Sequence, residues 1–110
     1  MRHVAERSVS EPVVLILISL AGKPKHGYAL LRDIEALSEG RVRLSTGTLY
    51  GALHRLLEDG WIERFEQDDT SRDKQAYRVT AEGRGQLRKE VERMSQLTRA
   101  ASRGLRTREA

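Results

Sequence analysis

The stretch STGTLYGALHRLLEDGWIER, residues 45–64, constrains the fold most strongly, because its hydrophobic period changes along its length. Its first part carries leucines at the spacing of one helix face, and Ser45 is the expected N-cap. These leucines are Leu49, Leu53, Leu56 and Leu57. Gly60 ends the helical pattern, and WIERFEQ then reads as a strand because Trp, Ile and Phe are concentrated in it. The sequence thus predicts a helix that leads directly into a β-strand.

Two helices precede this stretch, and a strand and a helix follow it. EPVVLILISLAGK is apolar nearly all round, has Pro12 in its first turn and is closed by Gly22 and Pro24. KHGYALLRDIEALSEG is amphipathic and ends at Gly40, after which RVRL alternates like a brief strand. QAYRVT reads as a second strand beyond the polar connection DDTSRDK, and Thr80 caps a long final helix.

This order of elements predicts a mainly α (α+β) fold, a winged helix-turn-helix with a two-stranded wing and a long C-terminal helix. We expect a flexible N-terminus at residues 1–9 and a winged-helix domain at residues 10–80. We expect a C-terminal dimerisation helix at residues 81–105 and a flexible tail at residues 106–110.

The composition argues against several classes of protein. The chain has no cysteine, which excludes disulfides and thiolate metal sites and fits a reducing cytoplasm. Its longest apolar run, residues 13–20, is far shorter than the roughly 20 residues that span a bilayer, so no membrane association is expected. The histidines His3, His26 and His54 have no partner at helical spacing, and no nucleophile–base pair is recognisable. We therefore expect no metal, no cofactor and no catalytic site.

The charge indicates an anionic partner without naming it. The net charge is +4 and the sequence pI is about 9.8. Residues 1–60 hold 8 basic and 7 acidic side chains, whereas residues 61–110 hold 12 and 9. The last twelve residues contain four arginines against Glu109. This tail is either a solvated helix end or a contact surface, and the sequence favours the solvated end slightly.

The third predicted helix has an outer face suited to a DNA groove. Opposite the leucines lie small residues and polar side chains, namely Gly47, Thr48, Gly51, His54, Arg55 and Glu58, with Tyr50 on the flank. Small residues permit close approach of the helix, hydroxyls can bind phosphate, and His54 and Arg55 can reach base edges. An ordinary solvated face would look similar on this helix alone. The hairpin that follows favours DNA binding, and Arg72 and Lys74 in its acidic connection can touch the backbone.

Three motifs together resemble the PadR family of bacterial transcriptional regulators. They are HGYALLRDIE, STGTLYGALHRLLEDGWIER and KQAYRVTAEGR, and the resemblance runs from about residue 11 to about residue 97. It implies a winged-helix homodimer that binds double-stranded DNA, represses promoters with inverted repeats and is often released by a small-molecule effector. Many family members have proline where this chain has Gly51, which leaves the helix more flexible here. The short C-terminal region suggests the small branch of the family.

The resemblance, with Thr46 at the helix start and Arg72 in the wing added, gives a set of candidate DNA contacts. They are Tyr28, Ser45, Thr46, Thr48, Tyr50, His54, Arg55, Arg72, Lys74 and Tyr77. A protein-interaction adaptor that kept the winged helix but lost DNA binding is the alternative. The acidic residues of the wing connection and Gly51 keep that alternative open.

The final helix carries an apolar stripe that predicts a dimer interface. We expect the stripe to pack against the apolar first helix of a second copy, because the earlier helices already fill their own core. The expected interface residues are Val13, Leu17, Leu20, Leu87, Val91, Met94, Leu97 and Ala101. The competing arrangement folds the last helix back on its own domain as a monomer. No residue identifies an effector, since Trp61 follows the third helix directly and is expected in the core.

Overall fold

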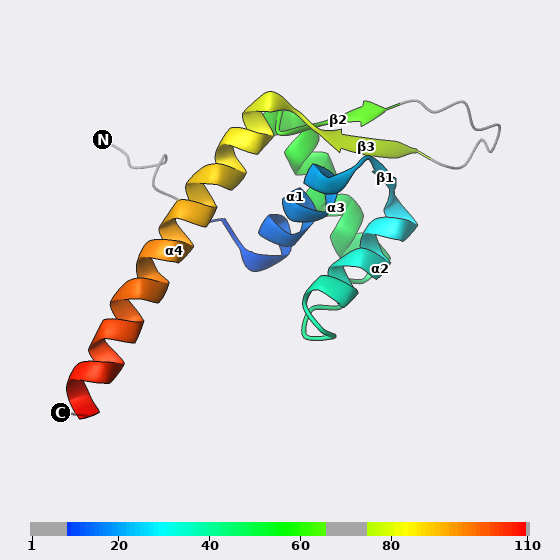
Figure 1. The fold of residues 1–110 in the computed structure, drawn as a ribbon. Coiled ribbons are helices and arrows are strands. Elements are labelled where there is room, and N and C mark those ends of the chain that lie inside the picture. Colours follow the sequence, from blue (N-terminus) through cyan, green and yellow to red (C-terminus); the bar gives the residue numbers. More distant parts are fainter. Residues whose placement is uncertain (1–8, 66–74, 110) are drawn as a thin grey trace.

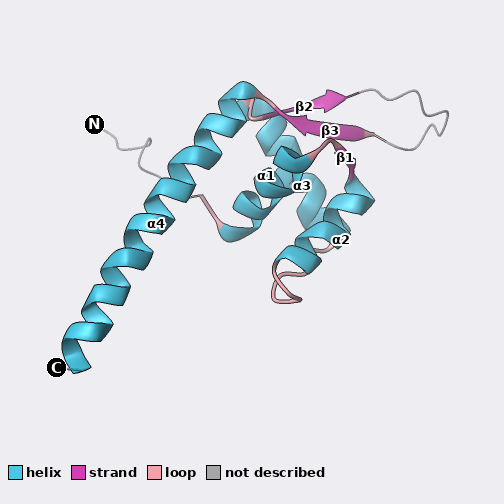
Figure 2. Ribbon diagram, viewed as in Figure 1, coloured by secondary structure: helices cyan, strands magenta, loops and turns pink. Residues whose placement is uncertain are grey.

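The computed structural model describes residues 9–65 and 75–109, and residues 1–8, 66–74 and 110 lie outside the description. Its helices and strands follow the predicted order, with one short strand in an unexpected place (Figures 1 and 2). The elements are α1 (Glu11–Gly22), β1 (Lys25–His26), α2 (Gly27–Leu37), α3 (Thr46–Asp59), β2 (Ile62–Phe65), β3 (Ala76–Val79) and α4 (Ala81–Glu109). The predicted mainly α winged helix-turn-helix with a long C-terminal helix is confirmed.

The strands form a small antiparallel sheet in the order β1-β3-β2. β2 and β3 are the two sides of the wing, with Ile62 opposite Val79 and Phe65 opposite Ala76. The third strand is β1 and not the RVRL segment, which was wrongly expected to be a strand. A strand of two residues has no period that a sequence can reveal, and β1 exists because its backbone pairs with β3.

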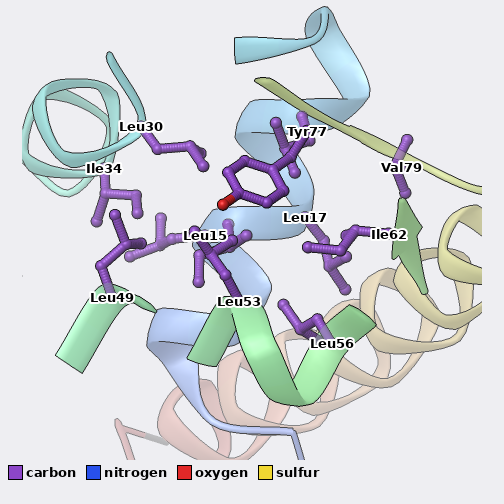
Figure 3. Packing of buried hydrophobic residues seen from close by; sticks show 12 residues of the cluster. Leu15, Leu17, Leu30, Ile34, Leu49, Leu53, Leu56, Ile62, Tyr77 and Val79 are labelled. Carbon is purple, nitrogen blue, oxygen red and sulfur yellow. The ribbon is translucent and has the colours of Figure 1, made fainter. Parts of the chain in front are cut away.

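The hydrophobic core lies where α1, α2, α3 and the sheet meet (Figure 3). Ile16 and Leu17 of α1, Leu30 and Ile34 of α2, and Leu49 of α3 are completely buried. The α1 helix contacts α2, β3 and α4 of the same chain. Its nearly uniform apolar surface is therefore covered mostly from within the chain, and does not by itself require a second copy.

Polar contacts fix α2 and the β1 strand before it against α1. The Ser19 hydroxyl donates a hydrogen bond of 2.5 Å to the Asp33 carboxylate, and the Lys25 ammonium donates one of 2.6 Å to the Ser19 carbonyl. Lys25 also lies 3.8 Å from the Asp33 carboxylate. Because Ser19 is buried, these bonds satisfy polar groups that water does not reach, and they hold the middle of α2 and the preceding β1 strand against α1.

The α4 helix begins at a tight junction with the end of α3. The Thr80 hydroxyl donates a hydrogen bond of 2.6 Å to the Gly60 carbonyl and accepts one of 3.0 Å from the Gly83 N–H. The Thr80 N–H also donates to the Trp61 carbonyl at 3.0 Å. Gly83 packs so closely on that carbonyl that a Cβ would collide with it. These contacts set the direction in which α4 leaves the domain.

Beyond this junction α4 extends away from the winged-helix body (Figure 1). Its 29 residues correspond to roughly 44 Å of helix, and the whole molecule measures 62 × 37 × 22 Å. The helix continues to Glu109, four residues past the predicted end at 105, since neither proline nor a positive-φ glycine interrupts it before that residue.

We predict that Gly83→Ala destabilises the protein by about 1–3 kcal/mol, because the new methyl group meets the Trp61 carbonyl and the junction must shift. Urea denaturation followed by circular dichroism measures the change. Gly85→Ala is the matched control, since a Cβ at Gly85 meets no other atom and alanine favours the helix. Equal stability of the two variants would contradict the proposed tightness of the junction.

Candidate nucleic-acid interface

The α3 helix is held at both ends and along one side. The Ser45 hydroxyl accepts a hydrogen bond of 3.1 Å from the Thr48 N–H, which confirms Ser45 as the N-cap. Gly60 ends the helix with a φ of 78°, a conformation that glycine adopts without strain. Leu49, Leu53 and Leu56 face the core and are at most 3% exposed. The opposite face of α3 is therefore fixed toward the outside.

That outer face has small residues at its N-terminal end. Thr46, Gly47, Thr48 and Gly51 are all exposed. A Cβ added at Gly47 or Gly51 would meet no other atom of the chain, so the packing of this domain does not require glycine at either position. Glycine inside a helix costs about 1 kcal/mol relative to alanine. Close approach by another molecule is a physical reason for keeping both.

Further along the outer face lie His54 and Arg55, both exposed. The His54 imidazole lies 3.3 Å from the Glu58 carboxylate, one turn later on the helix. Arg55 forms no ion pair with any side chain in the described ranges. The guanidinium of Arg55 is thus available to hydrogen-bond acceptors of a binding partner. One imidazole nitrogen of His54 is instead already paired with the Glu58 carboxylate.

Tyr50 lies on the flank of α3 and turns its hydroxyl inward. The phenol packs directly over Gly27 at the start of α2, where any Cβ would collide with it. The Tyr50 side chain is nevertheless 44% exposed. It joins α3 to α2, and what it offers to a partner is mainly its ring.

Tyr77 was expected in the DNA contact, and the structure places it in the core instead. Its side chain is 5% exposed and packs among leucines (Figure 3). Burial raises the pKa of the Tyr77 hydroxyl, nearby Tyr50 raises it further, and Arg64 lowers it. The prediction was wrong because β3 turns Tyr77 and Val79 to the core and only Arg78 outward.

Tyr28 at the start of α2 is 68% exposed, which leaves it accessible for the expected contact. The Arg32 guanidinium lies 5.8 Å from the centre of its ring, and with Glu35 and Ala36 the pair lines a shallow hollow on α2. The sequence reasoning did not select Arg32, although its i+4 spacing from Tyr28 was a usable signal.

The described part of the wing presents two arginines. Arg64 is exposed, and Arg78 donates a hydrogen bond of 2.7 Å to the Glu63 carboxylate while lying 4.8 Å from the centre of the Phe65 ring. The expected contacts Arg72 and Lys74 lie outside the described residues.

The expected interface residues divide into three groups by their exposure. Leu17 and Leu20 are 0% and 1% exposed inside their own core, so the prediction that they face a partner is corrected. Val13 and Leu87 are partly buried against that core. On α4 the side chains of Val91, Met94, Leu97 and Ala101 are exposed, and α1 adds Ile18, which the sequence reasoning did not select.

Two further observations narrow the chemistry of this surface. Among the side chains that the structure describes, no three carboxylate or imidazole groups gather in the manner of a metal site. Within residues 9–65 and 75–109, no helix is both long and apolar enough to cross a membrane.

Comparison with known proteins shows the family. Residues 15–89 match the model of the transcriptional regulator PadR-like family. The chain is 36% identical over 85 residues to an uncharacterised 37.1 kDa protein in a transposon of Streptomyces fradiae, of which it spans only 23%. That match covers 77% of this chain. This chain is also 34% identical over 84 residues to a transcriptional regulator of Mycobacterium tuberculosis, and the match covers 76% of both chains.

A solved structure shares the fold. A PadR family transcription regulator from Clostridium difficile superposes with a TM-score of 0.73 at 21% identity, covering 87% of this chain and 99% of that one. This likeness supports the fold, and the family match over residues 15–89 supplies the class, that of transcriptional regulators. The chain belongs to the PadR-like family of transcriptional regulators.

Proposed function

We propose that this protein is a cytoplasmic repressor that binds a palindromic operator as a homodimer. The observation that carries the proposal is the outer face of α3, where small residues and Arg55 are exposed while Leu49, Leu53 and Leu56 hold the helix rigidly from behind. A rigid helix with an open N-terminal end can enter a major groove.

Different positions along the exposed face of α3 have different roles in the proposed DNA contact. Thr46 and Thr48 lie beside the helix N-terminus, where hydroxyl and backbone N–H groups favour phosphate oxygens. Gly47 and Gly51 allow the backbone to approach, and Arg55 lies one to two turns further along, at the position for a guanine edge. Ser45 is already engaged with Thr48, so its role in the proposal is to cap the helix.

The dimer rests on the apolar stripe of α4. Val91 is 51% exposed, Met94 38%, Leu97 56% and Leu105 70%, and Ile18 of α1 is 37% exposed. An apolar stripe of this length on one helix is favourably covered by another copy of itself. A two-fold dimer would then present two α3 helices, and binding in successive major grooves on one side of DNA requires them to lie about 34 Å apart, one turn of DNA.

Release by a small-molecule effector of unknown identity completes the proposal. A pocket between two copies would be lined by Met94 and aliphatic side chains of α4, and a flexible thioether adapts to varied ligands. Trp61 packs against the core and does not belong to the exposed stripe on α4.

Fluorescence anisotropy tests the proposal most simply, with the duplex upstream of the protein's own coding sequence beside a scrambled duplex. Tighter binding to the upstream duplex that weakens with salt would support a specific repressor, since phosphate contacts release counterions. Equal binding to both would count against an operator at that site. The absence of binding at low salt would favour the adaptor.

We predict that Arg55→Ala reduces operator affinity by about 1–3 kcal/mol and relaxes the preference at one base pair. The reason is that an exposed guanidinium without a protein partner is available for bidentate contact with guanine. Titrations against single-base operator variants measure both effects. Arg41→Ala, which removes an exposed arginine paired with Glu11 outside α3, is the control and should leave base preference unchanged.

We predict that Gly51→Ala stabilises the folded protein by up to about 1 kcal/mol and yet weakens operator binding. The fold leaves room for the methyl group, whereas a close DNA backbone would not. Thermal denaturation and operator titration of the same variant separate the two effects, with Gly85→Ala as the control. Tighter or unchanged binding would show that the α3 backbone does not approach DNA at this position.

We predict that Leu97→Glu converts the dimer to a monomer, because the charge enters the centre of the apolar stripe. Sedimentation velocity measures the association state. Gln96→Glu introduces the same charge one residue away, off the stripe, and should preserve the dimer. A wild-type protein that sediments as a monomer at all concentrations would refute the proposed interface.

A further inference from the structure

The net charge of the protein is concentrated in one helix. The α4 segment, residues 81–109, carries eight basic and four acidic residues, and the other 81 residues carry twelve of each. The rest of the chain is therefore neutral, and the entire net charge of +4 belongs to α4. The excess positive charge of this protein therefore lies outside α3, the helix that we propose to enter the DNA groove.

Four of the six arginines that are exposed in the described part of α4 share one side of the helix. At about 100° per residue, Arg88, Arg99, Arg103 and Arg106 fall within an arc of roughly 60°. The apolar stripe is centred roughly 130° away around the same helix. A second copy packed on the stripe would thus leave the arginine face open. Glu92 is the one acidic residue that falls within this arc.

Three of these arginines have no ionic partner, like Arg55 of α3 and unlike three exposed arginines of the body. Arg41, Arg43 and Arg78 each pair with a glutamate at 2.8, 3.2 and 2.7 Å. Within the described ranges, neither Arg88, Arg99 nor Arg103 forms an ion pair, and Arg99 only donates a hydrogen bond of 3.1 Å to the Ser95 hydroxyl. Their positive charge is not neutralised by the chain itself.

The helix dipole does not account for this arrangement. Cations stabilise a helix C-terminus, but the effect is confined to about the last turn. It can explain Arg106 and Arg108, while Arg88, Arg99 and Arg103 lie further back along the helix. An ordinary solvated face would also mix both signs, as the winged-helix body does.

We propose that the arginine face of α4 binds the phosphate backbone of double-stranded DNA without regard to sequence. From Arg88 to Arg106 the helix spans about 27 Å, so its charges are spaced for an extended polyanion and not for a small anion. Duplex DNA carries one negative charge per roughly 1.7 Å of its axis. The choice of DNA as the polyanion rests on the proposed function, and α4 adds a second contact surface to that of α3.

The test compares two double variants that remove equal charge. Arg99→Gln with Arg103→Gln removes two charges from the arginine face, and Lys23→Gln with Arg41→Gln removes two from the exposed surface of the body. Affinity for a scrambled duplex is measured across a salt series. We expect the α4 variant to reduce the slope of log affinity against log salt by roughly 2 per protomer, since each phosphate contact contributes about 0.9. We expect the body variant to keep the wild-type slope.

The scrambled duplex separates this inference from the repressor proposal. A wild-type protein that prefers its operator, together with an unchanged slope in the α4 variant, would overturn only the α4 contact. Equal affinity for operator and scrambled duplex, with the slope lost in the α4 variant, would support the α4 contact and count against the repressor. No binding of the wild type to any duplex at low salt would overturn both.

Site-directed cross-linking gives an independent measurement. The chain has no cysteine, so Glu92→Cys carries a single photo-cross-linker within the arc of the arginines, and Ala101→Cys carries one about 180° away, on the apolar stripe. We expect cross-links to DNA from position 92 and cross-links to a second protomer from position 101. Cross-links from position 92 to a second protomer, with none to DNA, would overturn the proposal by showing that the arginine face pairs within the dimer.

Discussion

The junction at Thr80 connects the two halves of this molecule, and the proposed function depends on it. Its hydroxyl bonds the Gly60 carbonyl that ends α3 and the Gly83 N–H that begins α4. Trp61, the residue before β2, contributes its carbonyl to the same junction. These bonds are short, and Gly83 is closely packed against the Trp61 carbonyl. A change in the direction of α4 therefore has to move the end of α3. In the proposed dimer, the association of α4 would therefore set the separation of the two α3 helices.

The different roles that we propose for α3 and α4 follow from which side chains each helix buries. The α3 helix uses its leucines for the core and leaves a neutral, small-residue face outside. The α4 helix is covered only near its start and leaves both an apolar stripe and an arginine face exposed. Shape complementarity in a groove suits α3, whereas long-range attraction to a polyanion suits α4. Our proposals assign base reading to the first and dimerisation with backbone attraction to the second.

The sequence predicted those features that depend on local period and capping. The bounds of α3 followed from the leucine spacing, from Ser45 at the start and from Gly60 at the end. Each of these signals depends only on residues that are close in the sequence. The start of α4 was equally accessible through Thr80.

Features that depend on tertiary contacts were not predictable in the same way. A period shows which face of a helix is apolar but not what covers it, and so Leu17 and Leu20 were assigned to a partner. Tyr77 was misplaced because an aromatic residue in a half-exposed strand can face either side. The two-residue β1 leaves no signal of its own, since it forms only where β3 passes beside it.

Hydroxyl-radical footprinting of the DNA upstream of the coding sequence would test the central claim most directly. The account predicts two protected half-sites, related by a dyad and centred about 34 Å apart, one for each α3 helix of a dimer. A single protected stretch without symmetry, or uniform cleavage at protein concentrations that saturate binding, would contradict the account.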